Sequence, residues 1–234
     1  MGNLRRIPNC SECVLKGDSV FNNLSEDELL MLSIEKNCNS YKRGDIVYHE
    51  GNRMPGLFCI SQGILKLYKT GIEGKGQIVS FAKKGDIIGY RSVLSNEVAC
   101  TTAQVIEESV LCFIPADVFI NLVKTNSKFS IKIMRLACNE LGTANKLITD
   151  IAQKSVRERL AEILLILKDI FGVDENNILQ ISLTREEIAN LVGTATESVI
   201  RLLSEFKTEK IIELDGRRIR ILDEKKIIKI GNVY

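Results

Sequence analysis

Glu197 and Arg201 lie four residues apart in an amphipathic stretch, 184–206, that Gly193 divides into two short segments. Four residues make about one helical turn, so both side chains project from the same face of a helix. An Arg side chain can donate two hydrogen bonds to guanine, and a Glu side chain can accept one from cytosine. The pair therefore predicts a helix that reads base edges in a DNA groove.

The helical projection of the second segment separates an apolar stripe from a polar one. Ala195, Val199, Leu202, Leu203 and Phe206 form the apolar stripe, and Ile200 lies beside Arg201, where it could meet a thymine methyl group. The other candidate DNA contacts, mainly to phosphates, are Thr194, Thr196, Ser198, Lys207, Arg217 and Arg218. The alternative is an ordinary helical hairpin with a solvated outer face. Residues 174–234 carry ten Lys/Arg against eleven Asp/Glu, so bulk charge does not favour DNA binding.

Cysteines are the second group of residues that could do chemistry. Cys10 and Cys13 form a CxxC pair, which could bind a metal or act as a redox switch, although two thiolates do not complete a metal site. Seven cysteines is an odd number, which argues against a disulfide framework. The simplest reading of Cys38, Cys59, Cys100, Cys112 and Cys138 is that they are buried small apolar residues.

Several classes of protein are excluded by what the sequence lacks. It has no run of eighteen apolar residues, and its first residues have no apolar signal region, so we expect a cytoplasmic protein with no membrane segment. Such a location keeps thiols reduced. Walker and GxSxG motifs are absent. The sequence has a single His, and we see none available as the base for a Ser or Cys nucleophile, so we do not expect an enzyme.

The elements that must position these residues can be predicted from local patterns. Ser25 with Glu28, and Thr184 with Glu187, have the spacing of capping boxes, and the first box predicts a helix over about 26–35. Residues 41–115 alternate short apolar runs with glycines, which is typical of a β jelly roll. A further helix is expected over 155–171. The residues after 206 predict a small hairpin with its turn at Asp215-Gly216, which is the wing of a winged helix-turn-helix.

A long helix is expected between the two regions. From residue 131, apolar residues recur at alternating steps of three and four, in a heptad seam: Ile131, Met134, Cys138, Leu141, Asn145, Ile148 and Ala152. The seam could pack on the chain's own core. The narrow, sustained pattern favours a coiled coil between two subunits, with Asn145 fixing the register.

Taken together, the chain resembles the CRP/FNR family of transcription regulators over nearly all its residues. The most specific segments are GDIVYHEG at 44–51, GDIIG at 85–89 and TESVIRLL at 196–203. The resemblance implies an α+β fold: an N-terminal arm and effector-sensing jelly roll (cyclic-nucleotide-binding-like) over 1–127, a dimerisation helix over 128–152, and a winged helix-turn-helix over 153–234. It also implies a homodimer that binds double-stranded DNA and works with RNA polymerase. The family's base-reading Glu and Arg match Glu197 and Arg201, while Thr196 and Ile200 depart from its usual residues.

The resemblance also bears on the effector. Members that bind cyclic nucleotides follow GDxxG with a Glu and later place an Arg-Ser pair on the cyclic phosphate. Here Tyr90 and Arg91 follow Gly89, and Thr101-Thr102 stands at the Arg-Ser place. A cyclic phosphate without its Arg loses a charge-assisted contact. These five residues are therefore candidates for the pocket of an unidentified small-molecule effector other than cyclic AMP.

Cys10, Cys13 and Cys112 resemble the iron–sulfur ligands of the FNR oxygen sensor. A cubane cluster usually takes four thiolates, and Ser19 stands where a third N-terminal ligand would fall. An iron–sulfur cluster is therefore one hypothesis for a cofactor. The main expectation is a homodimeric regulator of transcription. The alternative is a redox or small-ligand sensor whose output is mainly protein–protein contact.

Overall fold

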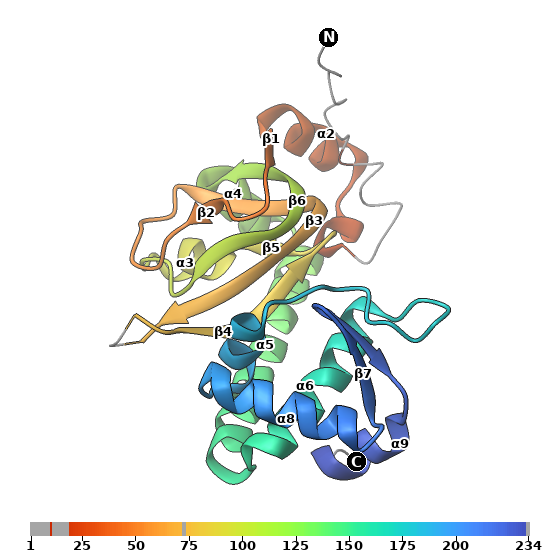
Figure 1. Cartoon of the computed structure of the whole chain (residues 1–234). Helices are drawn as coiled ribbons and strands as arrows, with labels where there is room; N and C mark the ends of the chain where they lie inside the picture. Colours follow the sequence, from red (N-terminus) through yellow and green to blue (C-terminus); the bar gives the residue numbers. More distant parts are fainter. Residues whose placement is uncertain (1–9, 11–18, 72–73, 233–234) are drawn as a thin grey trace. The chain divides into compact units, whose positions relative to one another are not determined.

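The structure is a computed structural model that describes residue 10, residues 19–71 and residues 74–232 (Figure 1). The chain divides into two compact units. The first comprises Met1–Lys69 and Val79–Gly142, and the second comprises Thr70–Ile78 and Thr143–Tyr234. The fold is α+β, as the sequence predicts. Among the described residues, no helix is both long and apolar enough to cross a membrane.

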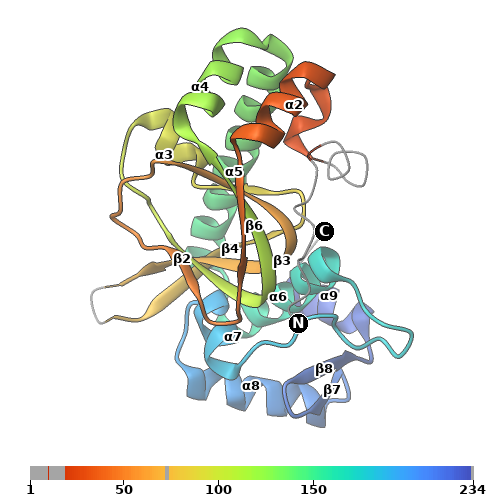
Figure 2. The same cartoon turned by 90° about the horizontal axis from the view of Figure 1, so that it is seen from above.

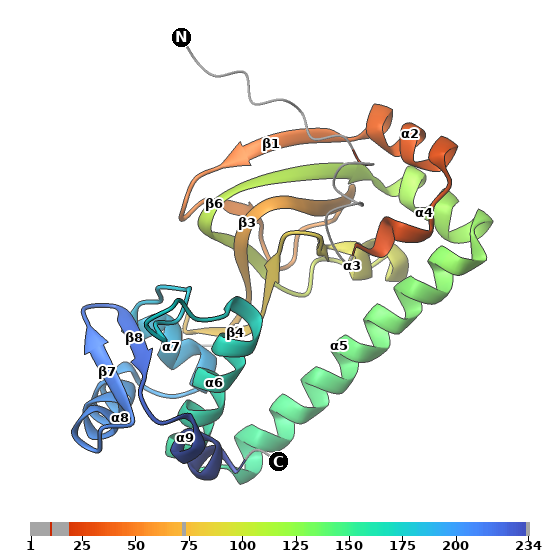
Figure 3. The same cartoon turned by 90° about the vertical axis from the view of Figure 1, so that its right-hand side faces the viewer.

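A six-stranded sheet forms the centre of the first unit. Its strands are β1 (Asn37–Tyr41), β2 (Ile46–Tyr48), β3 (Gly56–Thr70), β4 (Gly76–Lys83), β5 (Ile87–Ile88) and β6 (Thr102–Pro115). The order is β1-β6-β3-β4, with β2 paired to β6 and β5 paired to β3. Figure 3 shows β1, β6 and β3 side by side. The predicted glycine-punctuated roll is confirmed, and its two long strands, β3 and β6, pair antiparallel at its centre.

A bulged stretch bends the pairing of these two long strands. The register between β3 and β6 shifts between Ile60 and Leu65. Gly63 lies at this point with a φ of +95°, and a Cβ there would overlap Ser109. Only glycine fits such a position, because it lacks a Cβ and tolerates positive φ. The bulge allows one continuous ladder to curve into a roll.

Helices cover one end of this sheet. They are η1 (Val20–Asn23), α2 (Glu26–Glu35), α3 (Tyr90–Ser95) and α4 (Ala116–Thr125). The capping box predicted for Ser25 and Glu28 is present, and α2 has the predicted bounds. Figures 2 and 3 show α2 and α4 beside each other, and the core beneath them includes Leu32, Phe119 and Phe129.

The long helix α5 (Ser127–Gln153) has two apolar faces. Phe129 and Ile133 are buried in the core of the first unit. The heptad seam predicted from the sequence lies elsewhere on the helix surface, and Met134, Leu141 and Ile148 are 57%, 62% and 65% exposed. A single chain therefore leaves this seam in water.

The second unit contains the predicted helix pair and hairpin. Its elements are α6 (Val156–Phe171), α7 (Arg185–Val192), α8 (Thr196–Thr208), β7 (Ile212–Asp215), β8 (Arg218–Ile221) and α9 (Glu224–Gly231). Ser155 and Glu158 form a capping box at the start of α6, which ends at Gly172. The sequence had indicated this helix and the hairpin, and both are confirmed.

Candidate nucleic-acid interface and effector pocket

The turn between α7 and α8 is built from local interactions. The Thr184 hydroxyl accepts a hydrogen bond from the Glu187 amide, and the Glu187 carboxylate accepts one from the Thr184 amide, which completes the predicted capping box. Gly193 ends α7 with a φ of 71°, and its amide donates to the Ala189 carbonyl at 2.9 Å. This left-handed residue turns the chain sharply, so that α8 starts three residues later.

Helix α8 presents two faces of opposite character. Val199, Leu202, Leu203 and Phe206 are buried, as predicted. Ala195, which the projection placed on the same stripe, is exposed because it is the N-cap residue and precedes the first helical turn. Glu197, Ile200, Arg201 and Ser204 are exposed, and Thr194, Thr196 and Ser198 are half-buried near the start of the helix. The predicted base-reading residues thus share one accessible surface.

Arg201 takes part in an ion-pair network that the sequence did not indicate. Its guanidinium lies 2.6 Å from a carboxylate oxygen of Glu205, whose other oxygen lies 3.2 Å from Arg157 of α6. The Arg157 guanidinium lies over the ring of Phe206, 4.8 Å from its centre. Glu205 is visible in the sequence as the fourth residue after Arg201, but the contribution of Arg157 depends on tertiary structure.

The hairpin places further cations beside the helix pair. Arg217 and Arg218 are exposed in and after its turn, and Lys207 is exposed in the last turn of α8. Arg185, at the start of α7, donates a hydrogen bond to the Gly216 carbonyl at 2.8 Å. This contact ties the turn of the hairpin to α7, so the wing has a defined position on the helix pair (Figure 2).

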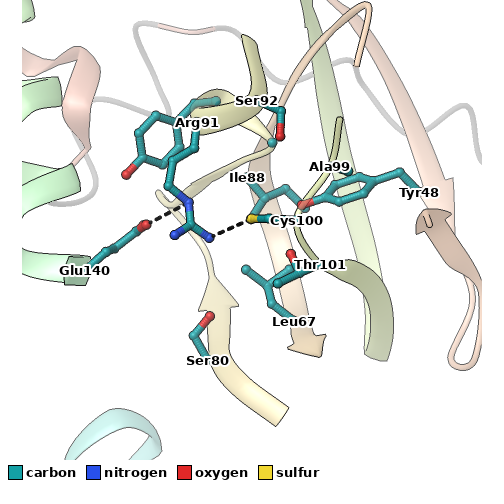
Figure 4. Close-up of a pocket in the computed structure, with 12 residues that line it drawn as sticks. Tyr48, Leu67, Ser80, Ile88, Arg91, Ser92, Ala99, Cys100, Thr101 and Glu140 are labelled. Carbon is teal, nitrogen blue, oxygen red and sulfur yellow. Dashed lines mark hydrogen bonds and ion pairs between the residues drawn. The ribbon is translucent and has the colours of Figure 1, made fainter. Parts of the chain in front are cut away.

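In the first unit, a small pocket lies where the sequence predicted an effector site. Gly89, Tyr90, Arg91 and Thr101 line it, together with Tyr48, Leu67, Ser80, Ile88, Ser92, Ala99, Cys100 and Glu140 (Figure 4). Thr102 does not line it. Its hydroxyl accepts a hydrogen bond from the Glu50 amide at 3.0 Å and is part of the strand scaffold.

The charged groups of this pocket are paired with each other. Arg91 Nε lies 3.3 Å from a carboxylate oxygen of Glu140, and its Nη2 donates to the Cys100 sulfur at 3.3 Å (Figure 4). Glu140 comes from α5, far away in the sequence, and no local pattern indicated it. The pocket therefore contains a guanidinium that an internal carboxylate already partly neutralises.

Burial shifts the titration of the pocket's acidic groups. It raises the pKa of Tyr48 to about 12. It also raises the pKa of Tyr90, whose buried hydroxyl faces the Glu140 carboxylate without a hydrogen bond of normal geometry. Burial raises the pKa of Glu140 too, and the charge of Arg91 opposes that rise. The two tyrosines are therefore the part of the pocket with restricted access to water, whereas the Arg91 and Glu140 side chains are 48% and 37% exposed.

The cysteines differ from what the sequence indicated. Cys38 of β1 and Cys112 of β6 form a disulfide, so the expectation of reduced, unpaired thiols is wrong for this pair. Cys112 is buried, as expected. Cys100 and Cys138 are exposed rather than buried, because Cys100 lies in the bend before β6 and Cys138 lies on the outer surface of α5.

The cluster hypothesis does not fit this arrangement of thiols. Cys13 lies outside the described residues. Cys112, with its sulfur bonded to Cys38, is not a thiolate and cannot coordinate iron in this state. Within the described part of the chain, no three His, Cys, Asp or Glu side chains converge as metal ligands. The residues as placed here do not form a four-thiolate site.

Comparisons with known proteins match both units. Residues 38–126 match the cyclic nucleotide-binding domain family, and residues 158–230 match the Crp-like helix-turn-helix domain family. The chain is 28% identical over 228 residues to the fumarate and nitrate reduction regulatory protein of Vibrio cholerae. This alignment covers 96% of this chain and 90% of that protein. It is 29% identical over 221 residues to electron transport regulator A of Shewanella oneidensis, over 93% of this chain and 88% of that protein.

A solved structure shows the same fold. A transcriptional regulator of the CRP/FNR family from Eubacterium rectale aligns with a TM-score of 0.73 at 24% identity, over 91% of this chain and 97% of that chain. Both family matches, the relatives and the helix-turn-helix geometry agree with the expectation from the sequence. The chain is a DNA-binding transcription regulator of the CRP/FNR family.

Proposed function

We propose that the protein binds a specific DNA sequence as a homodimer, with α8 in the major groove and Glu197 and Arg201 reading bases. The observation that carries this proposal is the exposed face of α8, where Glu197, Ile200 and Arg201 lie together above a buried apolar face. Thr194, Thr196 and Ser198, half-buried at the start of the helix, would orient it on the phosphates. Lys207, Arg217 and Arg218 would add phosphate contacts.

Homodimerisation through 128–152 is typical of the family and is supported by α5. Its exposed seam includes Met134, Leu141 and Ile148, three large apolar side chains that a monomer would leave in water. A second copy of the helix would cover the same seam symmetrically. A dimer would present two α8 helices to successive turns of the DNA, which is how helix-turn-helix proteins reach two half-sites.

The effector would be a small molecule that binds in the pocket around Arg91. An anionic effector could displace Glu140 from Arg91 and so change the contacts between the roll and α5. Cyclic AMP fits this pocket poorly, because Thr101 and Thr102 stand where a cyclic phosphate would need its Arg-Ser pair. The protein would act in the cytoplasm, by binding rather than catalysis, and would contact RNA polymerase.

Replacement of Arg201 by Ala tests the base-reading role. Specific duplexes would first be selected from random DNA with the wild-type protein. Loss of a bidentate contact to guanine should weaken specific binding by about 1–3 kcal/mol and relax selectivity at one base position of each half-site. Binding would be measured by fluorescence anisotropy at several salt concentrations.

Arg218→Ala provides the matched comparison, because it removes the same charge from the wing. A phosphate contact should weaken binding about equally on all sequences and lower the salt slope by roughly one. If Arg201→Ala shows this uniform behaviour instead, Arg201 does not read bases. If the wild-type protein selects no sequence at all, its output is protein–protein contact rather than specific DNA binding.

A further inference from the structure

Three cysteines lie in a row across three neighbouring strands of the roll. Cys112 of β6 is opposite Cys38 of β1 on one side and opposite Cys59 of β3 on the other. Opposite residues in antiparallel strands project from the same face of a sheet. The sulfur of Cys112 therefore has two cross-strand cysteine neighbours, of which Cys38 is bonded to it in this structure.

The row borders a cavity that a fourth cysteine also lines. Cys10, Cys59 and Cys112 share this cavity with apolar side chains that include Phe21 and Leu32. Cys10 is joined to the roll through its amide, which donates to the Ser33 hydroxyl of α2 at 3.3 Å. Four of the seven cysteines thus gather around one end of β1.

The fold does not need the disulfide for its stability. The chain has 234 residues and two packed units, so it buries enough apolar surface to fold without cross-links. A transcription regulator works where the genome is, in a compartment that keeps thiols reduced. Disulfides that form there are usually transient and sense redox state.

We propose that Cys38 and Cys112 form a reversible thiol–disulfide switch that controls DNA binding, with Cys59 as the alternative partner of Cys112. The reagents would be hydroperoxides for oxidation and small dithiols for reduction. This inference rests on the proposed function, because its output is DNA affinity.

The chemistry balances in both directions. In oxidation, one thiolate attacks a hydroperoxide, becomes a sulfenic acid and releases an alcohol or water; the partner thiol then displaces water and forms the disulfide. In reduction, a thiolate of the dithiol attacks Cys38, which is the less buried residue of the two, and releases Cys112 as a thiol. The second thiol of the reagent then closes its own disulfide and releases Cys38. Exchange from Cys38 to Cys59 transfers no net electrons.

The pair is placed where its state can alter the start of α5. β1 is at the edge of the sheet, and β6 is its neighbour. The disulfide joins residues 74 apart in the sequence, so its reduction removes the covalent link between β1 and β6. Helix α2 leads directly into β1. Its Glu28 accepts hydrogen bonds at 3.1 Å from Asn126, whose side-chain oxygen caps α5 at the Phe129 amide. A shift of β1 would therefore reach the head of the proposed dimer helix.

Differential alkylation of the full-length protein, followed by mass spectrometry, tests the chemistry. Samples would be equilibrated in graded mixtures of reduced and oxidised dithiothreitol. Cys38 and Cys112 should become alkylated together in a single two-electron transition. The double variant Cys38→Ser/Cys59→Ser should abolish that transition, because Cys38→Ser alone leaves Cys59 opposite Cys112. Cys138→Ser, which removes an exposed thiol of α5, is the control and should leave the transition unchanged.

The output is measured as DNA affinity, with the selected duplex, of the oxidised and reduced protein. The two states should differ by about 5- to 150-fold, the usual range of allosteric coupling, and the Cys38→Ser/Cys59→Ser variant should lose the difference. Hydrogen exchange at α2 and at the start of α5 should also differ between the states. This readout needs no DNA, so it distinguishes failure of the switch from failure of the proposed function.

Three results would overturn the proposal. Cys38 and Cys112 could be alkylated without reductant after treatment with hydroperoxide. The two redox states could show equal hydrogen exchange and equal DNA affinity. Finally, the reduced protein could take up iron and sulfide in a way that requires Cys112 but not Cys38, in which case the cysteines bind a cluster instead.

Discussion

Arg201 is poised on an exposed helix face, but its guanidinium is already engaged by Glu205. In an isolated helix the order Arg then Glu is the less favourable one for an i,i+4 pair. Here Arg157, packed on Phe206, holds the second oxygen of Glu205 and so supports the pair. A base that binds Arg201 must compete with Glu205, and the carboxylate itself opposes the approach of phosphates.

Glu205→Gln should therefore tighten DNA binding. An exposed ion pair of this kind contributes about 0.3–0.5 kcal/mol, so we expect a change of roughly twofold in the dissociation constant, measured by anisotropy titration. Glu224→Gln removes the same charge from the ion pair with Lys168 and is the control. Weaker binding by the Glu205 variant would show that the carboxylate positions Arg201 for DNA rather than competing with it.

At the scale of elements, a buried carboxylate joins the end of α5 to α6. Glu162 is 4% exposed, and its two oxygens lie 2.6 Å from Lys146 and 2.6 Å from Lys154. Lys154 also pairs with Asp150 at 3.2 Å. A carboxylate with so little access to water depends on both lysines for its hydrogen bonds. The network therefore fixes how α6 follows the last turns of α5.

Lys154→Met should destabilise this unit by about 1–3 kcal/mol, because it leaves one oxygen of a buried carboxylate without its charged donor. Urea unfolding, followed by circular dichroism, measures the effect. Lys168→Met is the matched control on α6, because that lysine makes a more exposed ion pair with Glu224 and its loss should cost less than about 1 kcal/mol. Equal effects of the two substitutions would contradict a special role for Lys154.

Stability should also depend on pH through Glu162. Burial raises the pKa of Glu162, but the hydrogen bonds and charges of Lys146 and Lys154 outweigh it, and the net shift is downward from 4.5. A lowered pKa in the folded state means that the unfolded state binds more protons. The contribution of Glu162 to the free energy of unfolding is therefore fully present above pH 4.5 and is lost as the pH falls through the folded pKa. The free energy of unfolding, measured from urea curves at several pH values across this range, should depend less on pH in Glu162→Gln than in the wild-type protein. An unchanged slope would assign the pH dependence to other carboxylates.

At the scale of the whole molecule, the exposed seam of α5 is the feature that a monomer does not explain. Ile131, Met134, Leu141 and Ile148 are all more than two-fifths exposed. They follow the heptad spacing, which gives a narrow stripe suited to a second helix. Association of two chains through this stripe would remove the apolar surface from water.

Leu141→Asp should break the dimer, because it places a charge in the seam of both copies. A cost of about 3 kcal/mol raises the dimer dissociation constant by roughly a hundredfold, which sedimentation equilibrium detects. Asn139→Asp adds the same charge to an exposed position two residues away, off the seam, and should leave the association unchanged. A dimeric Leu141 variant would show that the subunits associate elsewhere.

The amino-acid sequence by itself determined the features that depend on neighbours within one or two turns. The capping boxes at Ser25 and Thr184 were predicted because each uses residues three apart. The two stripes of α8 and the break between the helices at Gly193 were equally local. Periodicity also predicted the roll, the long helix and the wing, since alternation and heptads record which side of an element faces a core.

Only the tertiary structure decided which distant residues meet. Arg91 with Glu140, Arg157 with Glu205, and Cys38 with Cys112 come from elements far apart in the chain. Charge, size and polarity alone do not specify such partners, because many lysines, arginines and carboxylates in the sequence could form them. The partner is chosen by strand register and helix packing. That is why the sequence predicted the DNA-reading face but neither the ion pair in the pocket nor the disulfide across the roll.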